Sequence, residues 1–326
     1  MQLTGELGPE SPEVMIPVDV RTLNECGAAM CDLYQFTSHR GYVLFLSKAA
    51  PFAEEMRGQL TQSRVRRLYI RPDEAQVYAA YLLNRLRRIS EDPDASVAEQ
   101  AEVAFQAAQF LTDRLFIEPE AHVFKGIRST VEATAEMMLQ DSRVAGAMMG
   151  LTRLGTYVYD HSVNVAVFGS ALAMSLNPDP YWLRSVSLGL YVHDVGKIRL
   201  PREVLTMPGQ FAAAQWALMK QHPGLGLVVL RSFEEDDPIV RSIVVQHHER
   251  ADGSGYPRGL KGAQISLEAK ICAAADVFDA LTTARPYKDP ITTFAAIDKM
   301  IREMHQEFDR PIFERFILLF DRSFRQ

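Results

Sequence analysis

An adjacent histidine and aspartate, His193 and Asp194, close an apolar run in the segment YVHDVGKIRL, and this pair constrains the fold most strongly. Lys197 follows within one turn. Ionisable groups are costly to bury unless a partner or a metal ion compensates them. On a helix, both side chains extend the apolar stripe of Val186 and Leu190, so we expect them to point inward. The fold must therefore bring partners to this pair from elsewhere in the chain.

Other histidines and one aspartate are the candidate partners, because they also lie in apolar helical patterns. They are His161 beside Val165, His222 before a proline that we interpret as a helix stop, His247 and His248 after an apolar run, and Asp276 within KICAAADVFDAL. The remaining three histidines lie in polar surroundings, where we expect ordinary surface positions: His39, His122 and His305.

The chemistry of this set favours a metal site. A single inward histidine is usually an ordinary core residue, but five of them with two inward aspartates favour metal binding. Neutral imidazole and carboxylate suit first-row divalent metals. Asp194 could bridge two ions about 3.5–4 Å apart. Without thiolates, a catalytic site with open positions is favoured over a structural zinc site.

Longer motifs identify the resemblance. His161, the pair His193–Asp194 with Lys197, His222, HHERADGSGYPRGLKG (247–262) and ADVFDALTTARPYK (275–288) occur in the order found in the HD-GYP family of HD-domain phosphohydrolases. The chain resembles that family over about residues 125–325. The resemblance implies a phosphodiesterase that hydrolyses cyclic di-GMP to linear pGpG, and in some members on to GMP, through a metal-bridging hydroxide.

The resemblance also implies roles for individual residues. One metal is held by His161, His193, Asp194 and Asp276, and the second shares Asp194 and adds His222, His247 and His248. Lys197 binds a phosphate oxygen or assists the leaving group; a salt bridge to Asp194 is the alternative. Arg285 and Lys288 contact substrate phosphate, which suits a guanidinium and an ammonium. Tyr256 in the GYP loop either contacts substrate or shapes the loop by packing.

One position departs from the family pattern. Some members carry a metal-binding glutamate four residues before the first histidine, where this chain has Tyr157. A phenol is a poor ligand at neutral pH. We therefore expect two divalent ions, iron by family analogy with manganese as the alternative, and slow cleavage of pGpG.

The predicted fold is mainly α: a helical HD-domain core with additional helices of the HD-GYP type, preceded by a small α/β domain. The domains are residues 1–14, a flexible tail; 15–85, a small α/β regulatory domain; 86–124, connecting helices; and 125–326, the HD-GYP phosphodiesterase domain. In the small domain we expect strands over 42–47 and 66–71 with a helix over 49–62 between them. Helical periodicity begins at 73–89, with Val77, Tyr81 and Leu82 on one stripe.

Composition limits the remaining function classes. The net charge of −6 argues against binding polymeric nucleic acid. Three cysteines without CxxC spacing argue against a disulfide framework and favour a reducing cytoplasm. The sequence shows no signal peptide and no apolar stretch of membrane-spanning length. The expected ligand is a cyclic dinucleotide. GGDEF-type cyclases that contact the GYP loop and a second copy in a homodimer are the expected protein partners.

Two alternatives stay open at this point. The chain could be a non-catalytic receptor that binds a cyclic dinucleotide and signals through its N-terminal domain. It could also be a phosphohydrolase for another cyclic dinucleotide, such as cyclic GMP–AMP.

Overall fold

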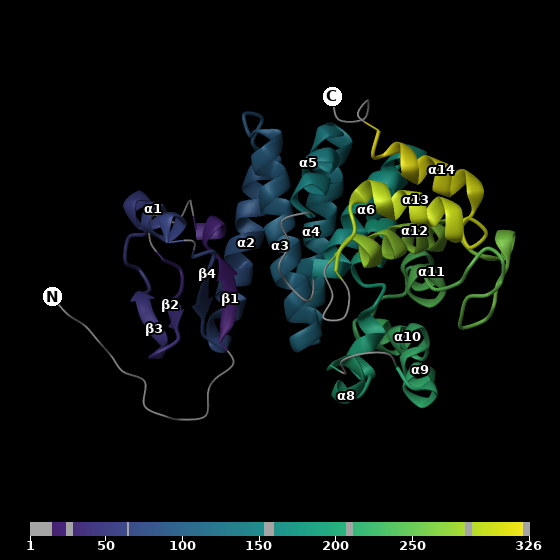
Figure 1. Cartoon of the computed structure of the whole chain (residues 1–326). Coiled ribbons are helices and arrows are strands. Elements are labelled where there is room, and N and C mark those ends of the chain that lie inside the picture. Colours follow the sequence, from purple (N-terminus) through teal and green to yellow (C-terminus); the bar gives the residue numbers. More distant parts are fainter. Residues whose placement is uncertain are drawn as a thin grey trace. The chain divides into compact units, whose positions relative to one another are not determined.

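The fold is taken from a computed structural model, which describes residues 15–23, 29–63, 65–152, 160–206, 211–283 and 289–321. The chain divides into two compact units, Met1–Glu91 and Asp92–Gln326 (Figure 1). Within the described segments, no helix combines the length and the apolar character needed to cross a membrane. The prediction of a mainly α chain with a small α/β part at its N-terminal end is confirmed.

The first unit contains a four-stranded antiparallel sheet in the order β1-β4-β2-β3. Its strands are β1 (Ile16–Asp19), β2 (Leu33–Thr37), β3 (Gly41–Leu46) and β4 (Arg67–Ile70). Two of these strands lie where the β-branched and aromatic runs predict them. Alternate residues of β4, Leu68 and Ile70, are fully buried, as expected for a sheet with one face against a core.

Two helices accompany this sheet, α1 (Glu54–Gln62) and α2 (Ala75–Glu91), along with the 3-10 turns η1 (Val20–Leu23) and η2 (Pro72–Glu74). Helix α1 begins five residues later than the sequence pattern predicts. The expected stripe on α2 is partly wrong, because Val77 is exposed. The buried stripe runs instead through Tyr78, Leu82 and Leu86, which a four-residue spacing places on one face.

The second unit is helical. Its α-helices are α3 (Val97–Ile117), α4 (Ala121–Gln140), α5 (Arg143–Leu151), α6 (Asp160–Leu176), α7 (Pro180–Tyr191), α8 (Arg202–Thr206), α9 (Ala213–Met219), α10 (His222–Ser232), α11 (Pro238–Gln246), α12 (Leu267–Thr282), α13 (Thr293–Glu303) and α14 (Arg310–Leu318). Among its described residues are also the 3-10 turns η4 (Val195–Arg199) and η5 (Gly262–Gln264). Helix α3 begins with a capping box in which Ser96 and Glu99 satisfy each other's backbone amides.

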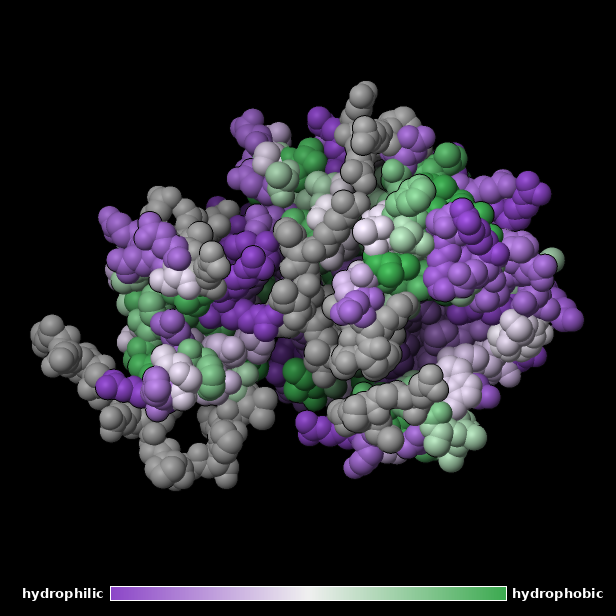
Figure 2. Space-filling view, in the orientation of Figure 1, coloured by the Kyte–Doolittle hydropathy of each residue, from purple (hydrophilic) through white to green (hydrophobic). Residues whose placement is uncertain are grey.

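Helix α6 forms the centre of this unit and packs against both α7 and α12. It is buried on every side, since Val163, Val165 and Val167 point in different directions and are all buried. Helix α12 in turn contacts α13 and α14 (Figure 1). Hydrophilic side chains dominate the surface over α13, whose opposite face buries Ala296 and Met300 (Figure 2). The core of the unit therefore lies around α6, and the ends of these helices position the candidate site.

Two local expectations about the helices that lead to this site are wrong. Helix α7 ends at Tyr191, so His193 and Asp194 lie in a turn before η4 rather than on a continued helix face. Pro223 occupies the first turn of α10, where its missing N–H costs nothing, so it begins a helix. In both places the histidine lies at a helix end, where local backbone carbonyls are available to orient its ring.

Candidate metal centre

Five helices or their ends bring the predicted ligands together. His161 lies in the first turn of α6, His222 begins α10 and Asp276 lies in the middle of α12. The pair His193–Asp194 follows α7, and the pair His247–His248 follows α11. The seven side chains fall into two groups, and within each group the ligand atoms all lie within 4.8 Å of one another. The first group is Asp194, His222, His247 and His248, and the second group is His161, His193 and Asp276.

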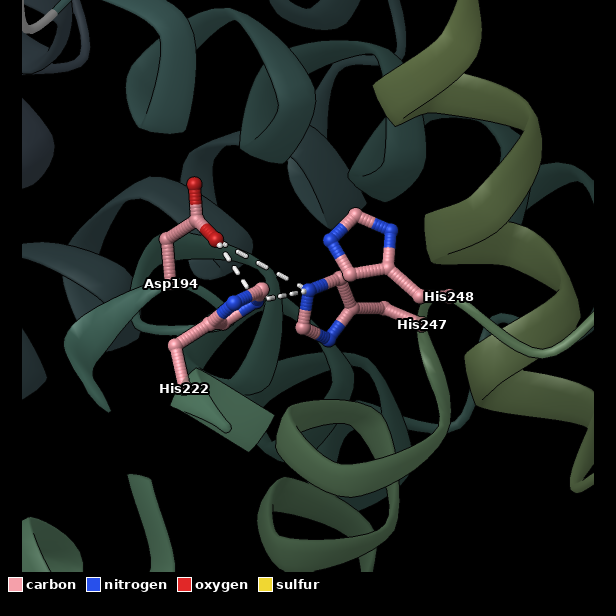
Figure 3. Close-up of side chains that lie close together, drawn as sticks. All are labelled: Asp194, His222, His247 and His248. Carbon is pink, nitrogen blue, oxygen red and sulfur yellow. Dashed lines mark hydrogen bonds and ion pairs between the residues drawn. The ribbon is translucent and has the colours of Figure 1, made fainter. Parts of the chain in front are cut away.

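The first group surrounds one carboxylate oxygen. Asp194 Oδ1 lies 3.3 Å from His222 Nε2 and 3.7 Å from His247 Nε2. The two imidazole nitrogens are themselves 3.2 Å apart. In Figure 3 the carboxylate and the rings of His222 and His247 point toward one another, with His248 beside them. This geometry gathers nitrogen and oxygen donors around a single point.

The second group faces the other oxygen of the same carboxylate. Asp194 Oδ2 lies 3.5 Å from His193 Nε2 and 3.7 Å from His161 Nε2. His161 Nε2 is also 3.2 Å from Asp276 Oδ1. Asp276 Oδ2 reaches back to the first group, 3.6 Å from His248 Nδ1. Asp194 thus lies between the two groups, which is the position that the sequence analysis assigns to a bridging ligand.

Hydrogen bonds on the far side of four rings fix their orientation. His193 Nδ1 lies 2.8 Å from the Leu190 carbonyl, and His222 Nδ1 lies 2.7 Å from the Met219 carbonyl. His247 Nδ1 lies 3.0 Å from the carbonyl of Val244. Since a carbonyl only accepts, each Nδ1 must donate, and each Nε2 of a neutral ring then carries a lone pair. The ring of His161 is held instead by the carboxylate of Asp279.

The donor set fits divalent metal ions. Lone pairs on the Nε2 atoms of His222 and His247 face each other and the Asp194 carboxylate, an arrangement that is repulsive without a cation between them. His193 Nε2 and Asp194 Oδ1 are buried atoms with no hydrogen-bond partner among the described residues. Buried polar atoms are nearly always paired, so these two indicate an additional group at this position. A cluster of imidazoles and carboxylates is suited to that role.

Electrostatics keep the ligand side chains in metal-binding forms. Burial lowers the pKa of His193 to about 4 and that of His222 to about 3, so both rings are neutral at pH 7. Burial raises the pKa of Asp194, but the charge of Lys197 together with the neighbouring histidines outweighs it and holds that pKa well below its usual range. The site therefore offers neutral imidazoles and ionised carboxylates to a cation.

His161 has the opposite electrostatic balance. Burial lowers the pKa of His161, but the hydrogen bonds to Asp276 and Asp279 outweigh it and raise the pKa to about 9. Without a metal ion, a proton on His161 therefore neutralises part of the surrounding negative charge. A metal ion in the second group would have to displace that proton.

A glycine allows η4 to approach α10 closely enough to join the two groups. A Cβ on Gly196 would overlap the His222 carbonyl oxygen and the Gly226 amide nitrogen. These are backbone atoms that cannot rotate away. Asp194 and Lys197 flank this contact, so the close approach brings both of them to the His222 side of the site.

Lys197 contacts the centre through Asp194. Its ammonium group makes an ion pair with Asp194 Oδ2, and its side chain is 29% exposed, whereas that of Asp194 is 4% exposed. The salt bridge that the sequence analysis gave as an alternative therefore exists in the structure. The side chain of Lys197 is therefore partly open to solvent while its ammonium group is paired with a buried carboxylate.

The loop that follows His248 is tied to the two adjacent histidines. The Glu249 carboxylate is buried and accepts hydrogen bonds from the amides of Arg258 (2.8 Å) and Leu260 (2.9 Å). The Tyr256 amide donates to the His248 carbonyl over 3.1 Å, and the two rings lie 4.7 Å apart. Tyr256 thus packs directly on a candidate ligand, as both of its sequence interpretations allow.

Sequence reasoning missed a second layer of residues behind the ligands. Asp279 Oδ2 lies 2.7 Å from His161 Nδ1, and Asp279 Oδ1 accepts from Asn164 (2.8 Å) and Thr283 (2.7 Å). A carboxylate behind a ligating histidine fixes its tautomer and raises its basicity. The sequence signal that could have found Asp279 is its spacing, because a residue three positions after Asp276 lies on the same face of the helix.

The remaining positions singled out by the sequence fall into two sets, three histidines that the structure describes and three residues that it does not. His39, His122 and His305 are exposed, as expected. The predicted phosphate-contacting residues Arg285 and Lys288, and Tyr157, which stands in place of a third-metal ligand, lie outside the described residues.

Comparisons with known proteins identify the family of the helical unit. The family model described as the HD domain matches residues 134–312. A cyclic di-GMP phosphodiesterase of Pseudomonas aeruginosa is 38% identical over 179 residues, which cover 54% of this chain and 43% of that protein. A 3′3′-cGAMP-specific phosphodiesterase of Vibrio cholerae is 39% identical over 124 residues, covering 38% of this chain and 24% of that protein. The chain thus spans less than half the length of these curated relatives.

One solved structure supports the fold along most of the chain. It is Bd1817, an HDG"Y"P protein from Bdellovibrio bacteriovorus, with a TM-score of 0.69 and 21% identity. The alignment covers 93% of this chain and 98% of that one. At this identity the likeness establishes the shared fold.

Proposed function

The chain belongs to the HD-domain family, and from that premise we propose that it is a metal-dependent phosphodiesterase of the HD-GYP type that hydrolyses cyclic di-GMP to linear pGpG. The observation that carries the proposal is the pair of ligand groups joined by Asp194. The names of relatives in Pseudomonas and Xanthomonas, the second being the cyclic di-GMP phosphodiesterase response regulator RpfG, support the choice of substrate.

We propose that two divalent ions bind at this centre, one at each ligand group, with Asp194 shared. Iron is the first candidate and manganese the second, since both accept imidazole and carboxylate ligands. When bound, such ions polarise a phosphoryl oxygen and make water acidic enough to react at neutral pH. Two ions rather than three, given Tyr157, would leave pGpG as the main product.

The chain's own side chains have separate tasks in the proposed reaction. Hydrolysis forms one new bond from phosphorus to a water oxygen, breaks the bond to a 3′ oxygen, and delivers a proton to that leaving oxygen. Lys197 lies beside Asp194 with a partly exposed side chain, and its ammonium group can stabilise charge on the phosphate or on the leaving oxygen. We assign Arg285 and Lys288 to the substrate phosphates on the sequence motif alone.

The test is direct hydrolysis. Purified protein, loaded with Fe²⁺ or Mn²⁺ under reducing conditions, is incubated with cyclic di-GMP, and the products are separated by chromatography. We expect pGpG to accumulate. Asp194→Asn is the matched control, because it keeps the shape of the side chain but removes the charge shared by both groups. Tight binding without any product would support the alternative of a non-catalytic receptor.

Cyclic GMP–AMP is a second candidate substrate, because a relative is named for that activity. Competition between cyclic di-GMP and 3′3′-cGAMP in one reaction measures the preference as a ratio of kcat/KM values. A ratio that favours the mixed dinucleotide would replace cyclic di-GMP as the proposed substrate.

For protein partners, we propose that the GYP loop, residues 252–262, is the contact for GGDEF-type cyclases and that the chain forms homodimers. The loop is held by Glu249 yet its residues Asp252 and Ser254 are exposed, which leaves a surface for a partner. Co-purification with a GGDEF cyclase and sedimentation of the isolated protein test these two proposals separately.

A further inference from the structure

A row of aromatic rings leads outward from the metal centre. The ring of His248 lies 4.7 Å from that of Tyr256, and the Tyr256 ring lies 5.9 Å from that of Trp216 at an angle of 76°. Trp216 in turn lies 6.3 Å from Phe211, nearly parallel at 20°. We name these three rings, Phe211, Trp216 and Tyr256, the aromatic row. The row joins the candidate ligand His248 to the surface of the molecule.

Trp216 is the exposed member of this row. It keeps 44% of its surface accessible, although Tyr256 and Phe211 lie on two of its sides. Helix α9, which carries it, has no buried residue. A tryptophan placed only to anchor a helix gains most by burying its large apolar ring. The half-exposed ring is therefore available to a further aromatic group.

The position of the row suits one part of a nucleotide. A phosphate bound near Lys197 and the ligand groups would lie at the inner end of the row. A base attached through its sugar must then lie away from the metal centre, where the aromatic row reaches the surface. Bases stack on aromatic side chains because every base has a π-face, and such stacking adds affinity with little selection among bases.

Resting on the function proposed above, we propose that Trp216, held in place by Tyr256 and Phe211, stacks on a purine base of the cyclic dinucleotide. Trp216 would then be a substrate-binding residue outside the motifs that identify the family. In this role Trp216 on α9 contributes to affinity for the base and takes no part in the hydrolytic step.

Fluorescence tests the contact itself, because the chain contains only two tryptophans, Trp182 and Trp216. Trp182 is on α7 and donates a hydrogen bond from Nε1 to Glu268 over 2.8 Å. Trp182→Phe leaves Trp216 as the sole emitter, and Trp216→Phe leaves Trp182 as the matched control. Each variant, loaded with Mn²⁺, is titrated with a non-hydrolysable phosphorothioate analogue of cyclic di-GMP and with ribose 5-phosphate.

We expect the analogue to quench Trp216 emission saturably, whereas ribose 5-phosphate leaves it unchanged because it has no base. Trp182 emission should not respond to either compound. Analogue binding, detected by calorimetry, that leaves Trp216 emission unchanged would overturn the inference. Equal quenching of both tryptophans would also overturn it, since it would report a general effect of the ligand.

Kinetics separate base stacking from a merely structural role. For Trp216→Ala we expect the KM for cyclic di-GMP to rise about 10-fold or more while kcat stays nearly unchanged. For Trp216→Phe we expect a KM close to that of the wild type, because phenylalanine keeps an aromatic ring. Hydrolysis of methyl p-nitrophenyl phosphate, which lacks a base and a sugar, should be unaffected. Phe294→Ala, which removes an aromatic ring that is 82% exposed on α13, is the control for surface changes.

The two proposals fail in different ways. Absence of hydrolysis by the wild type, with saturable quenching of Trp216, would reject the enzymatic function and keep the stacking contact. Normal hydrolysis with an unchanged KM in Trp216→Ala would reject the stacking contact and keep the function. A loss of activity toward both substrates in Trp216→Ala would show that the ring only shapes the site.

Discussion

At the scale of single residues, the centre depends on what stands behind each ligand. Nδ1 donates to a backbone carbonyl in His193, His222 and His247, and these carbonyls come from the same local helix ends as the rings. Asp279 performs the same task for His161 from a different helix. Orientation of the ligands is therefore mostly local, with one long-range exception, which makes Asp279 the most informative residue to change.

Asp279→Asn tests this long-range support. The amide can still accept from His161 Nδ1, but it carries no charge to raise the basicity of the ring. We expect metal affinity to fall by about 10–100-fold, measured by competition with a chromophoric chelator. Thr283→Val is the matched control, since it removes a hydrogen bond to Asp279 but keeps the contact with His161. Equal affinities for Asp279→Asn and wild type would contradict this role.

Lys197→Met tests the proposed role of the ammonium. Methionine keeps much of the length of the side chain and removes its charge. We expect kcat for cyclic di-GMP to fall by about 10²–10³-fold, because a donor to developing charge is lost. Metal content, measured by elemental analysis, should remain near that of the wild type. A proportionate loss of metal and activity would indicate instead that Lys197 acts only by holding Asp194.

At the scale of elements, most of the candidate ligands lie at helix ends. The sequence predicts which residues are ligands better than it predicts where the helices end. Apolar periodicity identifies the helices that carry His161, His247 and Asp276. It does not reveal that α7 ends at Tyr191, because Val192 continues the apolar pattern, whereas in the structure α7 packs against α11 and the following η4 packs against α10. Neither Asp279 nor Trp216 is predictable as a functional residue without knowing which elements meet.

Gly196→Ala tests the contact between η4 and α10. The added Cβ overlaps backbone atoms of α10, so η4 must move away and carry Asp194 with it. We expect the free energy of unfolding to fall by about 1–3 kcal/mol, measured in urea. Metal affinity should fall as well.

Gly224→Ala is the matched control, and it lies on α10, the helix that Gly196 contacts. A Cβ at this position meets no atom within 4 Å, and alanine in a helix is favoured over glycine by up to about 1 kcal/mol. We therefore expect unchanged metal binding and equal or higher stability. Similar losses in both variants would show that α10 tolerates no side chain in this region, and the specific contact would not be the cause.

At the scale of the whole molecule, two units each have their own core, and only the second contains the candidate ligands. The mainly α fold with a small α/β part in front follows from the change of periodicity along the sequence together with the family resemblance. The order of the four strands does not, since antiparallel pairing of β1 with β4 depends on contacts across about fifty residues. Metal should accordingly stabilise one unit more than the other.

Metal removal tests this asymmetry. We expect calorimetry to resolve two unfolding transitions, of which only that of the helical unit moves to lower temperature when a chelator replaces Mn²⁺. At an ion concentration 100 times the dissociation constant, binding adds about 2.7 kcal/mol of stability. This stabilisation arises because a bound cation offsets the repulsion between the facing imidazole lone pairs and the buried carboxylates. Equal shifts of both transitions, or none, would contradict the assignment of the ions to this centre.

The separation of the ligands along the chain has a consequence for biosynthesis. The hydrogen bond between His161 and Asp279 joins residues 118 positions apart, and Asp276 is the last of the seven ligands to be synthesised. A nascent chain that ends before α12 has all five imidazoles and Asp194, but it lacks Asp276 of the second group and Asp279 behind His161. A complete second group therefore requires that α12 has emerged from the ribosome, so a metal ion held by all the ligands of that group would mark a chain that has been made and folded through that helix.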